Sequence, residues 1–374
     1  MKLDTFLKLM QRPEEIILRS AVNQWQAVSG DMGYYIDSAI CFLTDTKGVI
    51  LYNKSCHVFT VGAGGNLTIS GATAIYSVTN MTDIFAARIS DSQAIVCDEH
   101  WEAAVPSGRA RVLTLDGSNN PSTNVAAVFE AGGMAYPSVT LLSATKALVC
   151  YSRLGLKCAV LTINDTLVTA TASVTIYDAA TTTYVTCAAL SSTKVICAYV
   201  DRGVDNSYKT KVVIINVSGT TATAATPVEV EGKYAHLKIQ KITETTALLS
   251  FGRNESPFDL LSVVLSVDRN DITVNDIATE TTGYIQTYLS TTMVSPTTCL
   301  LVTQYSPVSG TVHLAFNTAE VSGTTVHINP PEIVLNSHAG QRCYVDSKGG
   351  NAVFTYSILS GGEYPIRAVP LYFV

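Results

Sequence analysis

One pattern of apolar and polar residues recurs along the chain. An apolar run leads into a short polar turn, and a second apolar run follows, often ending in an aromatic residue. The clearest copies are 142–151, 190–199 and 242–251. Short apolar runs that are bounded by turn residues and rich in β-branched side chains predict β-strands. Each copy therefore predicts a hairpin of two strands, which we term A and B.

Weaker copies begin near Leu43, Ile89, Val294 and Val345 and extend the series to seven. One position near the start of strand B serves as an anchor that aligns the seven copies, at spacings of 46 to 53 residues: Gly48, Ala94, Ala147, Val195, Ala247, Cys299 and Ala352. Regular strand-rich repeats of this size are typical of β-propeller blades. Six or eight blades, or a solenoid of stacked hairpins, are the alternatives.

A second turn, rich in Gly, Asn and Asp, lies between successive A–B hairpins. Its copies are Ser70-Gly71, Asp116-Gly117, Asn164-Asp165, Ser218-Gly219, Asn270-Asp271 and Ser322-Gly323. These residue types tolerate the positive φ angles of tight hairpins. Each repeat therefore predicts four strands, A to D, with the second turn joining C to D.

The two kinds of hairpin differ in number, which predicts how the ring closes. There are seven A–B hairpins but six C–D turns, and the chain ends where the seventh is due. We therefore predict that residues 24–28 form strand D of blade seven and leave no unpaired sheet edge. The predicted fold is an all-β, seven-bladed propeller of four-stranded antiparallel blades over residues 23–374.

Residues 1–22 predict a short helical segment before the propeller. Leu3, Phe6, Leu7 and Met10 follow helical spacing, and Ile17 belongs to the apolar face of a second helical stretch. This segment would pack across the propeller, or it would dock the protein to a larger assembly or to a second copy.

Composition narrows the classes of function. Charged residues make up 14% of the chain, the net charge is −6, and no block of Lys and Arg occurs, so nucleic-acid binding is disfavoured. The sequence contains no run of 18 apolar residues, so it predicts no membrane-spanning helix. The first residues lack the apolar core of a secretory signal. The nine cysteines include no CxxC pair, so we expect buried free thiols in a protein that folds in a reducing cytoplasm.

No catalytic signature is present among the motifs of serine hydrolases, zinc proteases, P-loop proteins or dinucleotide-binding proteins. The repeated Ser-x-Asp-x-Gly-x-Thr-Trp turns of sialidases are also missing. The six histidines are scattered, without metal-ligand spacing. The sequence therefore predicts a protein without enzyme activity, cofactor or metal.

Polar loops after strand B carry the candidate ligand-binding residues. They are Asp98, Glu99 and Trp101 in blade two, Asp201 and Arg202 in blade four, and Arg253 in blade five. Because equivalent loops lie on one face of a propeller, these residues would line a shared site. Trp101 with its acidic neighbours is the best candidate for a sugar contact. The alternative is that they are ordinary solvated loop residues.

The wording of the repeats (Leu-Ser-x-Thr-Lys-Ala-Leu-Val-x-Tyr, then Ile-Asn-Val-Ser-Gly-Thr-Thr-Ala-Thr) resembles structural proteins of bacteriophages and phage-like particles of Gram-positive bacteria, such as tail-fibre and baseplate proteins. The resemblance covers about residues 38–374 and carries no site residues. It implies a particle component, assembled in the bacterial cytoplasm, that binds other particle proteins or a host-surface glycan. A bacterial lectin-like or protein-interaction propeller, and a carbohydrate-active enzyme, are the alternatives.

Overall fold

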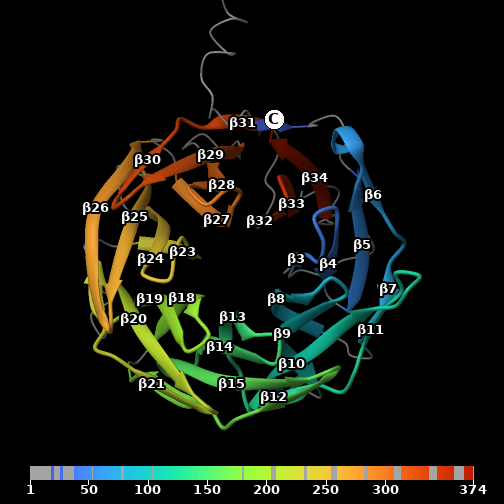
Figure 1. Ribbon diagram of the computed structural model, residues 1–374, viewed down its shortest axis with the longest axis horizontal. Helices are drawn as coiled ribbons and strands as arrows, with labels where there is room; N and C mark the ends of the chain where they lie inside the picture. Colours follow the sequence, from blue (N-terminus) through green and yellow to red (C-terminus); the bar gives the residue numbers. More distant parts are fainter. Residues whose placement is uncertain are drawn as a thin grey trace, which may run out of the picture.

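Seven antiparallel sheets stand as blades around a central channel (Figure 1). The computed structural model describes residues 18–20, 26–27, 38–52, 54–76, 80–102, 105–178, 181–203, 208–230, 234–253, 259–281, 285–306, 313–336, 343–357 and 366–373. The order of strands in each sheet confirms the seven-bladed propeller, with strands A, B, C and D running from the channel outwards.

The first four blades have the following strands. Blade one has β3 (Ser38–Phe42), β4 (Lys47–Tyr52), β5 (Ser55–Val61), β6 (Leu67–Ile69) and β7 (Thr73–Ala74). Blade two has β8 (Asn80–Ser90), β9 (Gln93–Glu102), β10 (Val105–Leu115), β11 (Pro121–Thr123) and β12 (Ala127–Glu130). Blade three has β13 (Ala135–Ser143), β14 (Lys146–Ser152), β15 (Leu156–Asn164), β16 (Leu167–Ala170) and β17 (Val174–Tyr177). Blade four has β18 (Thr182–Ser191), β19 (Lys194–Asp201), β20 (Lys209–Ser218), β21 (Thr221–Ala224) and β22 (Val228–Val230).

The remaining blades follow the same order. Blade five has β23 (Tyr234–Lys241), β24 (Thr246–Arg253), β25 (Asp259–Asp268) and β26 (Asp271–Thr281). Blade six has β27 (Ile285–Met293), β28 (Thr298–Ser306), β29 (His313–Ser322), β30 (Thr325–Ile328) and β31 (Glu332–Asn336). Blade seven has β32 (Cys343–Lys348), β33 (Asn351–Ser357), β34 (Ile366–Phe373), β1 (Leu18–Ser20) and β2 (Gln26–Ala27).

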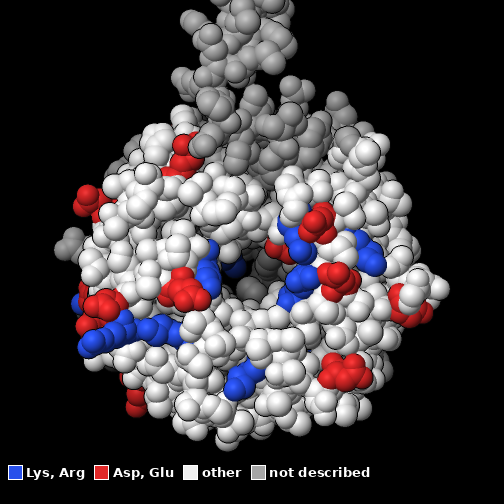
Figure 2. All heavy atoms as spheres, in the orientation of Figure 1, with Lys and Arg blue, Asp and Glu red and all other residues white. Residues whose placement is uncertain are grey.

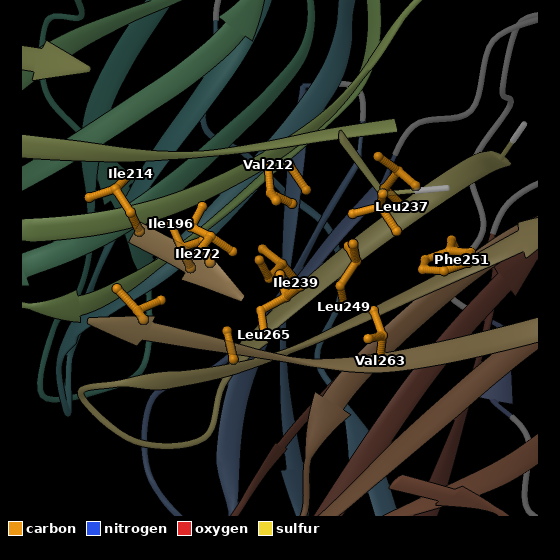
Figure 3. Packing of buried hydrophobic residues seen from close by; sticks show 14 of the residues in the cluster. Ile196, Val212, Ile214, Leu237, Ile239, Leu249, Phe251, Val263, Leu265 and Ile272 are labelled. Atoms are coloured by element: carbon orange, nitrogen blue, oxygen red, sulfur yellow. The ribbon is translucent and has the colours of Figure 1, made fainter. Parts of the chain in front are cut away.

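The hydrophobic core lies between blades rather than within them. Val195, Cys197 and Tyr199 of β19 pack towards blade three, whereas the alternating residues Ile196 and Ala198 pack towards blade five. Figure 3 shows the interface of blades four and five. Both faces of strand B are therefore buried, which explains why strand B reads as an unbroken apolar run. Each fully buried aliphatic side chain contributes roughly 1.5–3 kcal/mol.

The chain closes the ring as its hairpin counts predict. β2 pairs with Ala368 and Arg367 of β34, inside the predicted segment 24–28. β1 pairs with the end of the same strand, at Leu371 to Phe373. The two segments together form strand D of blade seven, because strand D is also split in two in every other blade except blade five.

The predicted N-terminal helical segment is wrong where the structure describes it. Leu18–Ser20 forms β1, and the described residues contain no α-helix, only the 3-10 turn η1 (Ala63–Gly65). The open edge of β34 offers unpaired backbone groups, and pairing with that edge outweighs a local helical pattern. The predicted docking residues lie outside the described residues: Leu3, Phe6, Leu7, Met10 and Ile17.

The C–D turns agree with prediction in part. Asp165, Gly219 and Gly323 have φ angles of 55°, 59° and 61°, as tight hairpins require. In blade five, Arg269 has the positive φ angle instead of Asn270. In blade two, Asn119 has it, and the Asp116 carboxylate accepts hydrogen bonds from the backbone N–H groups of Ser118 and Asn120.

Blade one departs furthest from the predicted turns. Ser70-Gly71 lies between β6 and β7, the two halves of strand D, rather than before strand D, and β5 is joined to β6 through Gly62–Asn66. This connection contains η1, in which the N–H of Gly65 bonds to the carbonyl of Gly62. The prediction failed because Ser-Gly also suits the bend between the two halves of strand D.

All nine cysteines are buried and unpaired. Burial raises the pKa of Cys56 and Cys299 to about 12, so these thiols remain protonated and behave as small apolar side chains. The expected buried free thiols are confirmed.

Candidate functional site: the mouth of the central channel

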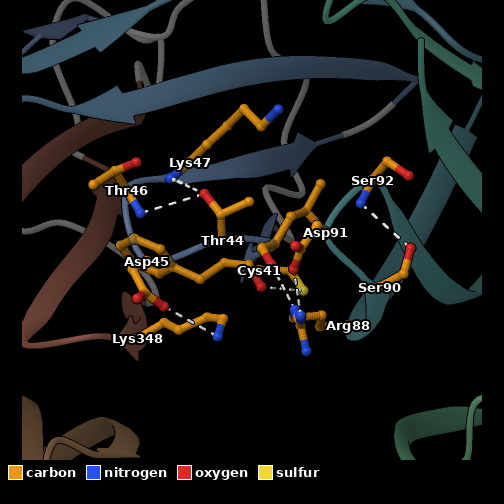
Figure 4. Close-up of polar contacts among 12 residues, drawn as sticks. Cys41, Thr44, Asp45, Thr46, Lys47, Arg88, Ser90, Asp91, Ser92 and Lys348 are labelled. Atoms are coloured by element: carbon orange, nitrogen blue, oxygen red, sulfur yellow. Dashed lines mark hydrogen bonds and ion pairs between the residues drawn. The ribbon is translucent and has the colours of Figure 1, made fainter. Parts of the chain in front are cut away.

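Strand A of each blade lines the channel, a cavity of about 640 Å³. Near the A–B hairpins its lining includes Arg88, Lys241 and Lys348, and Figure 2 shows Lys and Arg side chains on two sides of the central opening, with Asp and Glu side chains near them. Figure 4 shows that two of these cations, Arg88 and Lys348, have partners. The Nε of Arg88 donates to the carbonyl of Leu43 and Lys348 pairs with Asp45 at 3.1 Å, so this end of the channel is held together by its own contacts.

The opposite end of strand A carries a repeated distortion. In blades two to five a β-bulge interrupts the A–B pairing, and one residue of each bulge has a positive φ angle: Asp83 (50°), Tyr136 (53°), Tyr184 (52°) and His236 (56°). A bulge re-aims a side chain, and a non-glycine residue in this region stores strain that is common at binding sites. In four consecutive blades, strand A therefore contains a strained bulge that directs one side chain towards the channel.

The bulged residues form a continuous aromatic arc around the channel. The ring centroids of Tyr136 and Tyr184 lie 5.2 Å apart, those of Tyr184 and His236 lie 4.7 Å apart, and those of His236 and Tyr288 of blade six lie 5.3 Å apart. Asp83 joins the arc, because its carboxylate accepts a hydrogen bond from the backbone N–H of Tyr136. Side chains from five blades thus make one surface.

This arc encloses the channel mouth, a cavity of about 180 Å³. Its lining also includes Phe85, Lys238, Cys343 and Tyr344. Lys238 and Phe85 border both the mouth and the rest of the channel, and the Lys238 Nζ lies 5.0 Å from the Phe85 ring centroid. Because these residues come from blades five and two, Lys238 reaches across the channel and forms the floor of the mouth with Phe85. Cavities of about 150 Å³ hold a six-membered ring.

Desolvation in the channel shifts the titration of the lining groups. It raises the pKa of Asp83 to about 6 and that of Tyr136 to about 12. It lowers the pKa of His236 to about 4, with Lys238 contributing, and the pKa of Lys238 to about 8. At neutral pH the mouth therefore contains a neutral imidazole, an ionised Asp83 and a predominantly protonated Lys238.

The residues predicted in a loop of blade two lie instead in strand β9, which extends to Glu102, and they make contacts within their own blade and with blade three. Asp98 is fully buried and pairs with Arg111 at 3.2 Å, and burial raises its pKa to about 6. Glu99 accepts a hydrogen bond from the backbone N–H of Met134. Trp101 lies in β9, opposite Asn80 and Pro106, and its side chain is outside the described residues.

The other predicted residues belong to separate blades. Asp201 bonds with Lys211 at 2.8 Å and with the Tyr177 hydroxyl at 2.9 Å. Arg202 lies 5.4 Å from the Tyr208 ring centroid, and Arg253 pairs with Asp259 at 3.0 Å. The structure brings Asp201 and Arg202 together as chain neighbours, but these contacts do not join blade four to blade five. Ligand binding by these residues stays a prediction.

Sequence reasoning missed the mouth residues, although their spacing marks them. Asp83, Tyr136, Tyr184, His236 and Tyr288 each stand eleven residues before the anchor of their repeat. The same spacing leads from Gly48 to Asp37 and from Ala352 to Gln341, both outside the described residues. The side-chain type changes from blade to blade, so a search for repeated identities passes over the position.

Within the part of the chain that is described, no three His, Cys, Asp or Glu side chains gather as metal ligands. The same part contains no helix long and apolar enough to cross a membrane.

Comparison with known proteins shows the fold alone. No family model and no curated protein matches the chain. The BP39L lectin of Burkholderia pseudomallei matches with a TM-score of 0.55 at 11% identity, over 91% of this chain and 96% of its own. A Dyadobacter fermentans protein of unknown function matches with a TM-score of 0.54 at 10% identity, over 96% of this chain and 99% of its own. A putative 6-phosphogluconolactonase of Bacteroides fragilis matches with a TM-score of 0.54 at 9% identity, over 91% of this chain and 97% of its own. The chain therefore shares a propeller architecture with proteins of different activities.

Proposed function

We propose that the protein is a non-enzymatic binding module that holds one ring of a glycan in the mouth of its channel. The observation that carries this proposal is the aromatic arc formed by Tyr136, Tyr184, His236 and Tyr288, which four different blades direct into one cavity. The arc is assembled from distorted strands, whereas undistorted strands would complete the same fold at lower cost.

The mouth contains binding partners for both kinds of surface that a sugar ring presents. The C–H faces of a pyranose are apolar and lie well against aromatic rings, while its hydroxyl groups need hydrogen-bond partners. Tyrosine and histidine supply both an aromatic face and a polar atom, and the Asp83 carboxylate accepts hydrogen bonds. A concave, mainly aromatic site with a few placed polar groups is the usual form of a small-molecule site.

The number of carboxylates in the mouth favours glycan binding over glycoside hydrolysis as the function. Hydrolysis of this kind ordinarily uses two carboxyl groups on either side of the scissile bond. Among the described lining residues Asp83 is the single carboxylate. The rings beside the neutral His236 are those of Tyr184 and Tyr288.

We place this module on the surface of a phage or phage-like particle, where it binds a host-surface glycan. The support is the residue pattern of the repeats, which resembles that of tail and baseplate proteins. Many copies on one particle would strengthen weak individual contacts through avidity. Mass spectrometry of purified particles from the producing strain tests this placement: the protein should co-purify with tail proteins, and its absence from the particles would contradict it.

A screen of the purified protein against matched host-wall and commercial glycans tests the binding activity. The wild type should retain a subset of glycans at micromolar to millimolar concentrations and release no reducing sugar from them. Release of product at a catalytic rate would establish the enzyme alternative instead. A screen in which no glycan binds would overturn the proposed function.

A further inference from the structure

One position of strand A, two residues deeper in the channel than the aromatic arc, differs in kind among the blades. It stands nine residues before each anchor. Its occupants are Ala39, Phe85, Ser138, Thr186, Lys238, Ser290 and Cys343. Two residues along a strand correspond to roughly 6–7 Å, so this level is about one sugar ring below the arc.

Three of these residues have a clear structural task. The hydroxyls of Ser138, Thr186 and Ser290 accept hydrogen bonds from the backbone N–H groups of the next blade's strand A, at 3.0, 3.3 and 3.0 Å. A lysine ammonium has donors only and does not replace an accepting hydroxyl. Lys238 therefore breaks the pattern that ties neighbouring blades together.

In the part of the chain that the structure describes, the ammonium of Lys238 also has no anionic partner. Among the described residues no carboxylate or carbonyl bonds to Lys238 Nζ, which lies over the face of Phe85. By contrast, Lys211 pairs with Asp201, Lys348 with Asp45, and Lys241 donates to the carbonyl of Leu190. An unpaired charge in a desolvated channel destabilises the fold, and a ligand that supplies the missing anion relieves that cost.

We propose that the sugar ring held in the mouth carries a carboxylate, which pairs with Lys238 at the floor of the cavity. The ligand class is therefore an acidic sugar, such as a uronic acid residue. Its ring lies against the aromatic arc and its hydroxyls face Asp83, which is one level higher on β8, the strand that carries Phe85. This inference rests on the proposed function and specifies its ligand.

Matched sugars separate the charge from the ring. Methyl glycosides of glucuronic and galacturonic acid differ from those of glucose and galactose in having a carboxylate in place of a hydroxymethyl group. Ligand-observed NMR and calorimetry with these four probes, and with matched acidic and neutral members of the glycan screen, should show at least tenfold tighter binding of the acidic partner. Equal affinity within the matched pairs would overturn the inference while leaving the proposed function standing, and binding of neither partner in any pair would overturn both.

Variants of Lys238 then test the residue. Lys238→Met should abolish the preference for the acidic partner and retain the weaker binding of the neutral one, and Lys238→Arg should restore part of the preference. Lys209→Met removes an exposed lysine that pairs with Glu229 and should leave the preference unchanged. An acidic preference that survives in Lys238→Met would contradict the assignment.

Raising the pH removes the same charge without a mutation. Around Lys238 lie Asp83, His236, Cys343 and the tyrosines of the mouth. Asp83 and His236, with pKa values of about 6 and 4, complete their titration below pH 7.5. Cys343 titrates at about 12, and burial raises the pKa of Tyr184 and Tyr288. Affinity for the acidic sugar should therefore fall as pH rises through about 8, the pKa of Lys238, and an unchanged affinity at pH 9.5 would contradict the proposal.

Discussion

At the scale of single residues, the channel mouth contains groups that depart from the pattern repeated in the other blades. Lys238 interrupts the series of hydroxyls that bind the next blade, and the bulged residues hold positive φ angles. Natural proteins accept such costs at functional sites. The stability of single variants therefore reports which residues serve the fold and which serve the ligand.

Replacing Lys238 by Met should stabilise the protein by roughly 1–3 kcal/mol at pH 7. The pKa of this amine is about 8 in the fold, below its ordinary value of 10.5, so its protonated form is the one that burial disfavours. The penalty is fully present below pH 8 and disappears as pH rises from about 8 to 10.5. Urea unfolding of wild type and variant at pH 7 and pH 10 checks this: the gain should shrink at the higher pH. A loss of stability at pH 7 would show that Lys238 supports the fold.

Replacing Gly48 by Ala should destabilise the protein by roughly 1–3 kcal/mol. Gly48 stands where four other blades have Ala, but a Cβ there would lie 2.4 Å from both the Phe59 ring and the carbonyl oxygen of Cys41. The fully buried Phe59 occupies that space. Thermal unfolding tests the prediction, with Gly71→Ala of the same blade as control, because nothing lies within 4 Å of a Cβ at Gly71. Equal melting temperatures of Gly48→Ala and wild type would contradict it.

At the scale of elements, the strands were predictable because each one depends on local chemistry. Strand B is apolar on both faces and follows a polar turn, so its pattern repeats visibly in every blade. The closing strand was predictable from the mismatch in hairpin number. The assignment of residues 18–20 to a helix failed because their partner, Leu371–Phe373, lies at the other end of the chain, and short-range spacing carries no information about it.

Removal of the closing segments should open the ring. Deletion of residues 1–27 takes away β1 and β2 and leaves the outer edge of β34 unpaired, so the protein should melt at a lower temperature and aggregate more readily. Deletion of residues 1–17 keeps both segments and serves as the control. A peptide of residues 18–27 added to the shorter protein should restore part of the lost stability. Equal melting temperatures of the two deletion proteins would contradict the closure of blade seven by these segments.

At the scale of the whole molecule, strand A of the seven blades lines a channel whose two ends differ in chemistry. One end is held by paired cations such as Arg88 and Lys348. The other end is an aromatic mouth over a lysine floor. The sequence predicts the ring of blades but not this difference between its two ends. The difference becomes visible only when equivalent positions of the repeats are compared around the channel. The anchor residues align the repeats, so the comparison can be made from the sequence once it is known which positions before each anchor face the channel.

The affinity of the Tyr184→Ala variant for a glycan that the wild type binds tests the central claim most directly. Tyr184 is in the middle of the aromatic arc, 5.2 Å from the Tyr136 ring centroid and 4.7 Å from that of His236. The matched control is Val125→Ala, at a side chain that is 85% exposed. Calorimetry on folded proteins should show at least a tenfold loss of affinity, about 1.4 kcal/mol, for Tyr184→Ala and no change for the control. Unchanged affinity in the folded Tyr184→Ala variant would show that the glycan binds elsewhere on the propeller.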